Sequence, residues 1–363
     1  MSSNVRRKLI FAVKMAIMFS LLAWIGNQVH WRDYESITPG GEVNIRPGLL
    51  SCLSSFHPVY YLLAVALQLL TILLAAERWR LLMIVQGISL ERRSLYRLSF
   101  LGEFFNHFLP GAMGGDLVKA YYIMRYSGKR GAGVVSIFAN RFSGLVMMVI
   151  VSMFMLCGLL IFGNADSVAL KQPVYAVFIL GGALGLILFL ALNAKLNQSE
   201  KFVRLIALLP FSRQLETIRL AMHRHRHVKG LLLPVFFYSL LIVTAFVLSV
   251  MMIGLSLEID LRWFHFFIYL PLILIMTAVP VTPGGVGVME ELFLYFFSTA
   301  GDSQKILAMA LLYRLSLFLC GLPGGVIFLK ADKNTRRGMA EGMAEMEGEV
   351  GNLGESQVTK EMV

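Results

Sequence analysis

Six long runs of mainly apolar residues constrain the fold of this chain more than any other feature. An α-helix needs about 20 consecutive apolar residues to cross the hydrocarbon core of a bilayer. Charged residues make up only 15% of the chain, against about 25% in soluble domains, so too few polar side chains remain to cover a water-facing surface. We therefore expect an all-α integral membrane protein with six transmembrane helices and no soluble domain large enough to carry an active site. The runs are Leu9–Val29, Val59–Ala76, Val134–Phe162, Val174–Leu192, Leu231–Leu255 and Gln304–Leu329.

Two further apolar regions are interrupted by proline and glycine, and we expect each to form a re-entrant helical hairpin. Tyr96–Met124 is interrupted by Leu109–Asp116, and Trp263–Phe297 by Pro280–Gly287. Because proline removes a helical N–H donor and glycine loosens the backbone, a helix must break at both places. A broken backbone at membrane depth is tolerated only where protein or a water-filled cavity surrounds it.

The distribution of basic residues predicts the sidedness of the chain. The net charge is +11, which in a membrane protein usually reflects Lys and Arg held on the cytoplasmic side; we expect no nucleic-acid partner. Basic clusters precede the first run, flank the first interrupted region, fill the loop before Leu231 and follow the last run. The second interrupted region has acidic flanks instead. The pattern predicts a multi-pass protein of a bacterial inner membrane with both termini cytoplasmic, the first hairpin entering from inside and the second from outside.

The C-terminal tail, residues 331–363, is rich in glycine and glutamate. Such a composition cannot bury a core. We expect a disordered cytoplasmic tail after a membrane domain that spans residues 1–330.

An internal repeat links the two interrupted regions. Pro110-Gly111 and Gly114 match Pro283-Gly284 and Gly287 at an offset of 283 − 110 = 173 residues. Arg141 matches Arg314 at the same offset. Three membrane crossings would separate the two hairpins, so the halves 1–173 and 174–330 would have opposite orientations, as in the inverted-topology repeats of secondary transporters. Short matches of glycine and proline also arise by chance in membrane helices, and that alternative stays open here.

Arg141 and Arg314 each lie well inside an apolar run that follows an interrupted region. A charge near the bilayer centre costs at least about 2.5 kcal/mol, so each arginine should face the protein interior and have a partner. One interpretation is a structural ion pair with Glu103, Asp116, Glu290 or Glu291. The other is an anion site between the hairpin tips, where half-helices starting after Gly115 and Gly287 would point their positive ends at a lipid phosphate.

Three polar residues, Glu103, Asn106 and His107, share one helical face through their i, i+3, i+4 spacing. They could form a proton relay or a head-group contact, or they could form a satisfied polar seam between helices. The segment Glu77–Arg80 closes the second run, and its Trp79 and arginines read as interface anchors, with a role in attracting anionic head groups left open. No nucleophile–base pattern, phosphate-binding glycine loop or zinc spacing is present in the sequence, so we expect no enzyme, no cofactor and no metal.

The sequence resembles the lysylphosphatidylglycerol synthase transmembrane region, or flippase-like membrane domain, family. The resemblance covers most of the chain from Arg6 to Lys330. In the synthases that name the family a soluble aminoacyl-transferring domain follows this membrane region, and this chain is expected to correspond to the lipid-translocating part alone. The segments that carry the resemblance are Glu77–Arg80, Leu101–Gly111, Gly114–Asp116, Arg141–Gly144 and Pro283–Gly287 with Glu290.

The resemblance and the repeat together predict a membrane lipid transporter, or flippase, that moves an anionic phospholipid or an isoprenoid or glycolipid between leaflets. The alternative is a non-transporting accessory subunit that presents lipid to a separate synthase or glycosyltransferase. The candidate substrate-binding residues are Arg141, Arg314, Glu103, Asn106, His107, Pro110, Gly111, Gly114, Gly115, Asp116, Pro283, Gly284, Gly285, Gly287 and Glu290.

Overall fold

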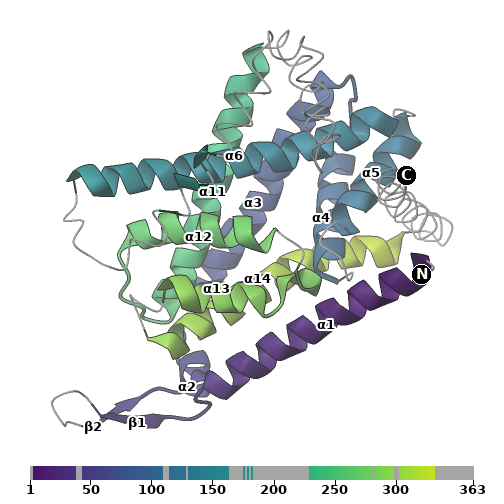
Figure 1. Cartoon of the computed structure of the whole chain (residues 1–363). Helices are drawn as coiled ribbons and strands as arrows, with labels where there is room; N and C mark the ends of the chain where they lie inside the picture. The colour runs from purple at the N-terminus through teal and green to yellow at the C-terminus, as the bar shows by residue number, and fades with distance from the viewer. Residues whose placement is uncertain are drawn as a thin grey trace, which may run out of the picture.

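The computed structural model of the chain is a bundle of helices with a small β-hairpin at one end (Figure 1). It describes residues 3–37, 43–108, 114–127, 130–162, 229–278, 281–297 and 302–331, with a few positions between 175 and 182. Pro110 and Gly111, most of the predicted span Val174–Leu192 and the tail beyond Ala331 lie outside the described residues.

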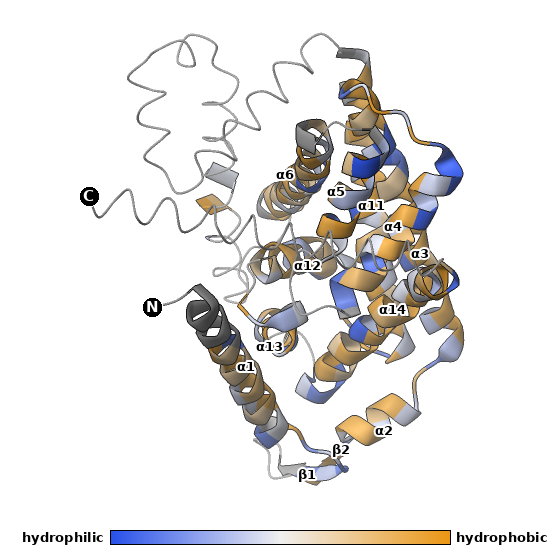
Figure 2. Ribbon diagram, turned by 90° about the vertical axis from the view of Figure 1, so that its right-hand side faces the viewer, coloured by the Kyte–Doolittle hydropathy of each residue, from blue (hydrophilic) through white to orange (hydrophobic). Residues whose placement is uncertain are grey.

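Four described helices are long and apolar enough to cross a membrane. They are α3 (Pro58–Val85), α6 (Arg130–Phe162), α11 (Lys229–Ser256) and α14 (Ser303–Lys330). Each contains one of the runs expected to span, and apolar residues cover most of their length in Figure 2. The first expected span is also a helix, α1 (Ser3–Gln28), of which the shorter stretch Ala12–Asn27 is apolar among the residues with described side chains. The chain is therefore a multi-pass membrane protein.

The expectation of an entirely helical chain was too strict. Between α1 and the short helix α2 (Leu49–Ser54), strand β1 (Tyr34–Ile37) pairs antiparallel with β2 (Val43–Arg46). The hairpin projects from the bundle at the lower left of Figure 1. Sequence reasoning missed it because strands of four residues give too short a pattern to be recognised.

The centre of the bundle is the pair α3 and α11, which run side by side (Figure 1). Small and branched side chains allow the close approach, with Ala64 on α3 and Val247, Val250 and Ile253 on α11 fully buried. The Ser249 hydroxyl donates a hydrogen bond to the Gln68 side-chain oxygen at 3.4 Å across the pair. This packing stabilises the contact between the N-terminal and C-terminal groups of helices.

Both interrupted regions consist of two shorter helices. In the first, α4 (Arg92–Phe108) is followed by α5 (Gly114–Ser127); in the second, α12 (Trp263–Thr277) is followed by the single turn η2 (Pro283–Gly285) and α13 (Val288–Phe297). Gly284, Gly285 and Gly287 have φ values of 62°, 66° and 83°. L-residues with a side chain rarely adopt such angles, so these glycines make the second break possible.

The contacts between helices occur in matched pairs. α4 packs on α14 and α12 packs on α6; α4 packs on α5 and α12 on α13; α5 packs on α6 and α13 on α14. Likewise, α3 contacts α6, α14 and α4, and α11 contacts α14, α6 and α12. Each contact made by the series α3, α4, α5, α6 therefore has a counterpart in the series α11, α12, α13, α14.

The contact between α4 and α14 is especially close. A Cβ added at Gly324 would lie 2.0 Å from the Phe100 carbonyl oxygen, and one added at Gly325 would lie 2.8 Å from the Phe104 ring. At Gly324 a side chain would meet backbone, so only glycine fits there, and at Gly325 a side chain would force the Phe104 ring to move. The missing side chains let the first limb of one broken pair rest directly on α14.

Candidate functional site

At the second break, Arg314 on α14 binds both the start of α13 and the broken backbone. Its guanidinium forms an ion pair with Glu290 through Nε and donates from Nη2 to Glu290 Oε2 at 3.0 Å. It also donates to the carbonyl oxygens of Gly284 at 3.2 Å and Gly285 at 3.1 Å. Four hydrogen bonds of this arginine thus go to the chain itself, and they hold η2 and α13 against α14.

Glu290 occupies the place at which an anion had been expected. It lies in the first turn of α13, and its Oε2 accepts the Gly287 backbone N–H at 2.8 Å. The carboxylate therefore satisfies one of the unpaired N–H groups at the helix N-terminus and its favourable dipole. At this site the structure has the structural ion pair, one of the two interpretations drawn from the sequence.

At the first break, Arg141 on α6 pairs in the same manner with Asp116 in the first turn of α5. The Asn106 side chain on α4 accepts the Gly115 N–H at 3.0 Å across the break. A Cβ added at Gly115 would lie 1.9 Å from the Gly102 carbonyl oxygen, so α4 and α5 touch backbone to backbone there. Gly115, one of the glycines expected in the site, thus serves the contact between the two limbs.

The two arginines differ in exposure. The Arg141 side chain is 46% exposed and that of Arg314 only 15%. Each pairs with a carboxylate of its own break, so the two do not share one partner. Glu103 is near enough to interact electrostatically with Arg141 and with Tyr313, the neighbour of Arg314.

The polar face Glu103, Asn106 and His107 is satisfied within the protein. His107 Nε2 and Glu103 Oε1 are 2.9 Å apart, while Asn106 binds α5 as described. The His107 ring also packs edge-on against Phe318 of α14, with ring centroids 6.0 Å apart. This arrangement is a polar seam among α4, α5 and α14; the proton relay and the head-group contact stay predictions.

The interpretation of Trp79 and Arg78 as interface anchors was wrong. Trp79 is 1% exposed and Arg78 is 5% exposed, because α3 extends beyond its apolar run and other helices cover both residues. The Lys119 ammonium lies 5.3 Å from the centre of the Trp79 ring. Sequence reasoning missed Lys119, and its only signal was a lysine inside an interrupted apolar region.

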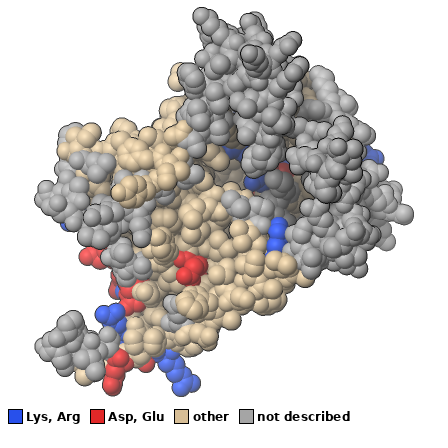
Figure 3. Space-filling view, in the orientation of Figure 1, with Lys and Arg blue, Asp and Glu red and all other residues tan. Residues whose placement is uncertain are grey.

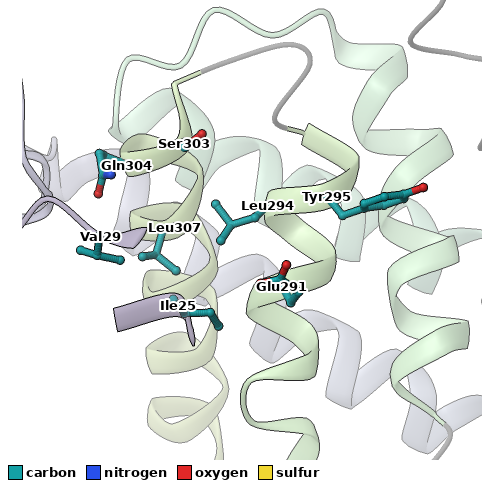
Figure 4. Close-up of a pocket in the computed structure, with 8 residues that line it drawn as sticks. All are labelled: Ile25, Val29, Glu291, Leu294, Tyr295, Ser303, Gln304 and Leu307. Atoms are coloured by element: carbon teal, nitrogen blue, oxygen red, sulfur yellow. The ribbon is translucent and has the colours of Figure 1, made fainter. Parts of the chain in front are cut away.

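A pocket lies on the other side of α13, between α1, α13 and α14 (Figure 4). Glu291 and Tyr295 come from α13, and the Tyr295 hydroxyl points away from the other labelled side chains. No hydrogen bond or ion pair joins the Glu291 carboxylate to another described residue, in contrast to its neighbour Glu290. The residues that line the pocket are Ile25, Val29, Glu291, Leu294, Tyr295, Ser303, Gln304 and Leu307.

The surface charge agrees with a membrane environment. On the face that Figure 3 shows, the described surface is mostly uncharged, and acidic and basic side chains gather mainly at the end that carries the β-hairpin.

The chain is similar to a known protein family and to several known membrane proteins. Residues 48–324 match the family described as the lysylphosphatidylglycerol synthase TM region. A UPF0104 membrane protein of Methanothermobacter thermautotrophicus is 24% identical over 281 residues, which cover 73% of this chain and 83% of the relative. A UPF0104 membrane protein of Methanocaldococcus jannaschii is 29% identical over 237 residues, or 64% of this chain and 95% of the relative.

Proposed function

Because this chain belongs to the family of the lysylphosphatidylglycerol synthase transmembrane region, we propose that it is a lipid transporter that moves a phosphate-bearing lipid between membrane leaflets. The observation that carries the proposal is the pair of helix breaks, each fastened by an arginine of the following long helix to an acidic residue just after the break. Broken helices with charged residues at membrane depth are typical of transport pathways. The family name refers to a phospholipid, which supports a lipid as the cargo.

The proposed architecture has six transmembrane helices and two re-entrant hairpins in an inverted-topology repeat. The matched contacts of α3–α6 and α11–α14 support the repeat, since two related halves around a two-fold axis make equivalent contacts. The matching ion pairs, Arg141 with Asp116 and Arg314 with Glu290, lend the same support. In this architecture, α4–α5 and α12–α13 are the hairpins, and they enter the membrane from opposite sides.

Within this architecture the substrate phosphate binds at the first break. Arg141 is about half exposed, whereas four hydrogen bonds occupy Arg314. A guanidinium offers a planar fork that suits two phosphate oxygens. Arg141 is thus the phosphate contact, Arg314 holds the second hairpin in place, and the lipid tails stay in the bilayer during alternating access.

Leaflet exchange in liposomes tests the proposal. Purified protein is reconstituted with fluorescent phosphatidylglycerol, and the fraction of probe that an impermeant quencher reaches is followed in time. We expect exchange to be faster than in protein-free liposomes. If wild-type protein gives no acceleration, the transporter is refuted and the accessory subunit that presents lipid to a synthase or glycosyltransferase is favoured.

Two arginine variants separate binding from structure. We expect Arg141→Gln to slow exchange by roughly tenfold or more, as loss of a charged hydrogen bond implies, with a small change in melting temperature. Arg314→Gln should lower exchange and melting temperature together. Arg93→Gln is the matched control, because Arg93 is an exposed arginine of α4 and its loss changes the net charge equally. Unchanged exchange in a stable Arg141→Gln protein would refute the assigned phosphate contact.

A further inference from the structure

Arg78 is a buried cation at the crossing of three helices. It lies on α3, 5% exposed, where α6 and α11 meet that helix. Its Nε donates to Asn140 Oδ1 at 2.9 Å and its Nη2 to the Asn140 carbonyl oxygen at 2.9 Å. Its Nη1 donates to the Ser239 hydroxyl oxygen at 3.0 Å.

All of these acceptors are neutral. Within the described part of the chain, no carboxylate lies within ion-pair distance of Arg78; the adjacent Glu77 binds Arg80, Arg92 and the Tyr96 hydroxyl instead. Buried charges in proteins are normally paired, since an unpaired one is costly. Arg314 follows that rule through Glu290, and Arg78 does not.

The surroundings of Arg78 favour an anion. A Cβ added at Gly144 would lie 3.4 Å from both terminal nitrogens, so a glycine without a side chain borders the guanidinium there. Asn140 directly precedes Arg141, which is half exposed at the first break. The Lys119 ammonium lies over Trp79, the next residue of α3. Three cations, Arg78, Lys119 and Arg141, therefore lie around α3, α5 and α6; Asp116 pairs with Arg141, and Glu103 interacts electrostatically with Arg141 and Lys119, which leaves Arg78 as the cation with only neutral partners among the described residues.

We propose that Arg78 is an oxyanion-binding centre, in which a phosphate group replaces the neutral acceptors Asn140 and Ser239. Three N–H groups bind Asn140 and Ser239 in the present conformation, and the fork of the guanidinium matches phosphate oxygens. The lipid head group reaches Arg78 from Arg141 along α6, by a movement of α6 relative to α3. This role rests on the proposed transport function, but binding can be measured without transport.

The variant Asn140→Asp gives the sharpest test, because it changes a neutral acceptor of Arg78 into a carboxylate of nearly the same shape. The new ion pair satisfies the guanidinium internally. The melting temperature should equal or exceed that of wild type, while affinity for the anion should fall by roughly tenfold to a hundredfold. Asn140→Ala is the matched control: it removes the side-chain acceptor but leaves the charge of Arg78 available, so we expect some destabilisation and near-normal affinity.

Binding is read as protection against thermal unfolding in detergent. The probes are short-chain phosphatidylglycerol, inorganic phosphate and, as a phosphate-free control, dioctanoylglycerol. Protection of wild type and Asn140→Ala, but not of Asn140→Asp, by phosphatidylglycerol alone identifies a lipid head group as the ligand. The same pattern with inorganic phosphate identifies a site for free phosphate as well, and it equally supports the oxyanion centre.

Three results would overturn the proposal. They are unchanged protection of Asn140→Asp, equal protection of wild type by dioctanoylglycerol, and a melting temperature of Asn140→Asp below that of Asn140→Ala. The last result would mean that the carboxylate does not reach Arg78. Failure of the proposed function would give a different result. If wild-type protein binds phosphatidylglycerol at Arg78 but does not accelerate leaflet exchange, the anion site stands and the transport role is refuted.

Discussion

Replacing Glu290 by glutamine removes the negative charge that neutralises Arg314 and leaves the volume of the side chain nearly unchanged. Glu290 is 3% exposed, and its two oxygens accept from Arg314 and from the Gly287 N–H. A glutamine keeps one oxygen and turns an NH₂ group toward a donor. Arg314 keeps its bonds to the Gly284 and Gly285 carbonyl oxygens, but no carboxylate charge compensates its own.

The expected loss follows from burial of the remaining charge. Breaking a buried ion pair by removing one partner costs about 3–5 kcal/mol, and because Arg314 keeps two carbonyl contacts we expect Glu290→Gln to cost about 3 kcal/mol, at the lower end of that range. Glu291→Gln is the control on the next residue, whose side chain has no described hydrogen bond or ion pair to lose, and it should change the free energy of unfolding by no more than about 0.5 kcal/mol.

Unfolding by sodium dodecyl sulfate in mixed micelles measures both free energies. The double variant Glu290→Gln with Arg314→Gln should be less destabilised than the sum of the single variants, because the uncompensated charge is removed. Equal losses for Glu290→Gln and Glu291→Gln, or additive losses in the double variant, would refute the ion pair as the fastening of the second break.

Three further predictions concern other parts of the chain. Gly115→Ala should lower the free energy of unfolding by about 1–3 kcal/mol or more, as overpacking does, because the new Cβ would meet the backbone of α4. The control Gly158→Ala, whose Cβ would have no atom within 4 Å, should be neutral or slightly stabilising in the same micelle assay. In a cysteine-free background, cysteines at Arg93 and Arg130 should react with an impermeant maleimide only from the cytoplasmic side. Reaction of the two from opposite sides would refute the proposed first hairpin, and reaction of both from outside would refute its sidedness. The pKa of Asp33 lies below its ordinary value because the Ser51 hydroxyl and a backbone N–H donate to the carboxylate. The ionised carboxylate therefore stabilises the loop after α1 at neutral pH, and this stabilisation is lost as the pH falls through the lowered pKa. Hydrogen exchange of that loop should accelerate in acid, and Asp33→Asn should already show fast exchange at neutral pH.

The parts of the fold that were predictable are those encoded locally. Apolar length predicted α3, α6, α11 and α14, and proline and glycine predicted the two breaks, since both signals act through the backbone of their own segment. The position of Arg141 and Arg314 inside apolar runs was sufficient to predict a partner for each, but it left open whether that partner is a carboxylate of the chain or a lipid phosphate. The choice of Asp116 and Glu290 among four acidic candidates required the structure, because it depends on how one helix lies across another.

The parts that were missed depend on neighbours distant in the sequence. Arg78 and Trp79 close an apolar run, and nothing in that run indicates that α6 and α11 cover them. Lys119 carries no periodic signal, and its place over the Trp79 ring follows from the close contact of α4 and α5. Hydrophobic periodicity reports which face of a helix is buried, but not which polar side chain of another helix it meets.

The contacts that each group of helices makes with the other have a consequence for the permeability barrier of the proposed transporter. The first limb of each broken pair rests on the last helix of the other group, α4 on α14 and α12 on α6. Because Gly324 and Gly325 bring α14 against the backbone and rings of α4, a displacement of α14 carries α4 with it. In the proposed transporter, opening at one face of the membrane would therefore be coupled to the elements at the opposite face, and the same packing would oppose a continuous leak of ions.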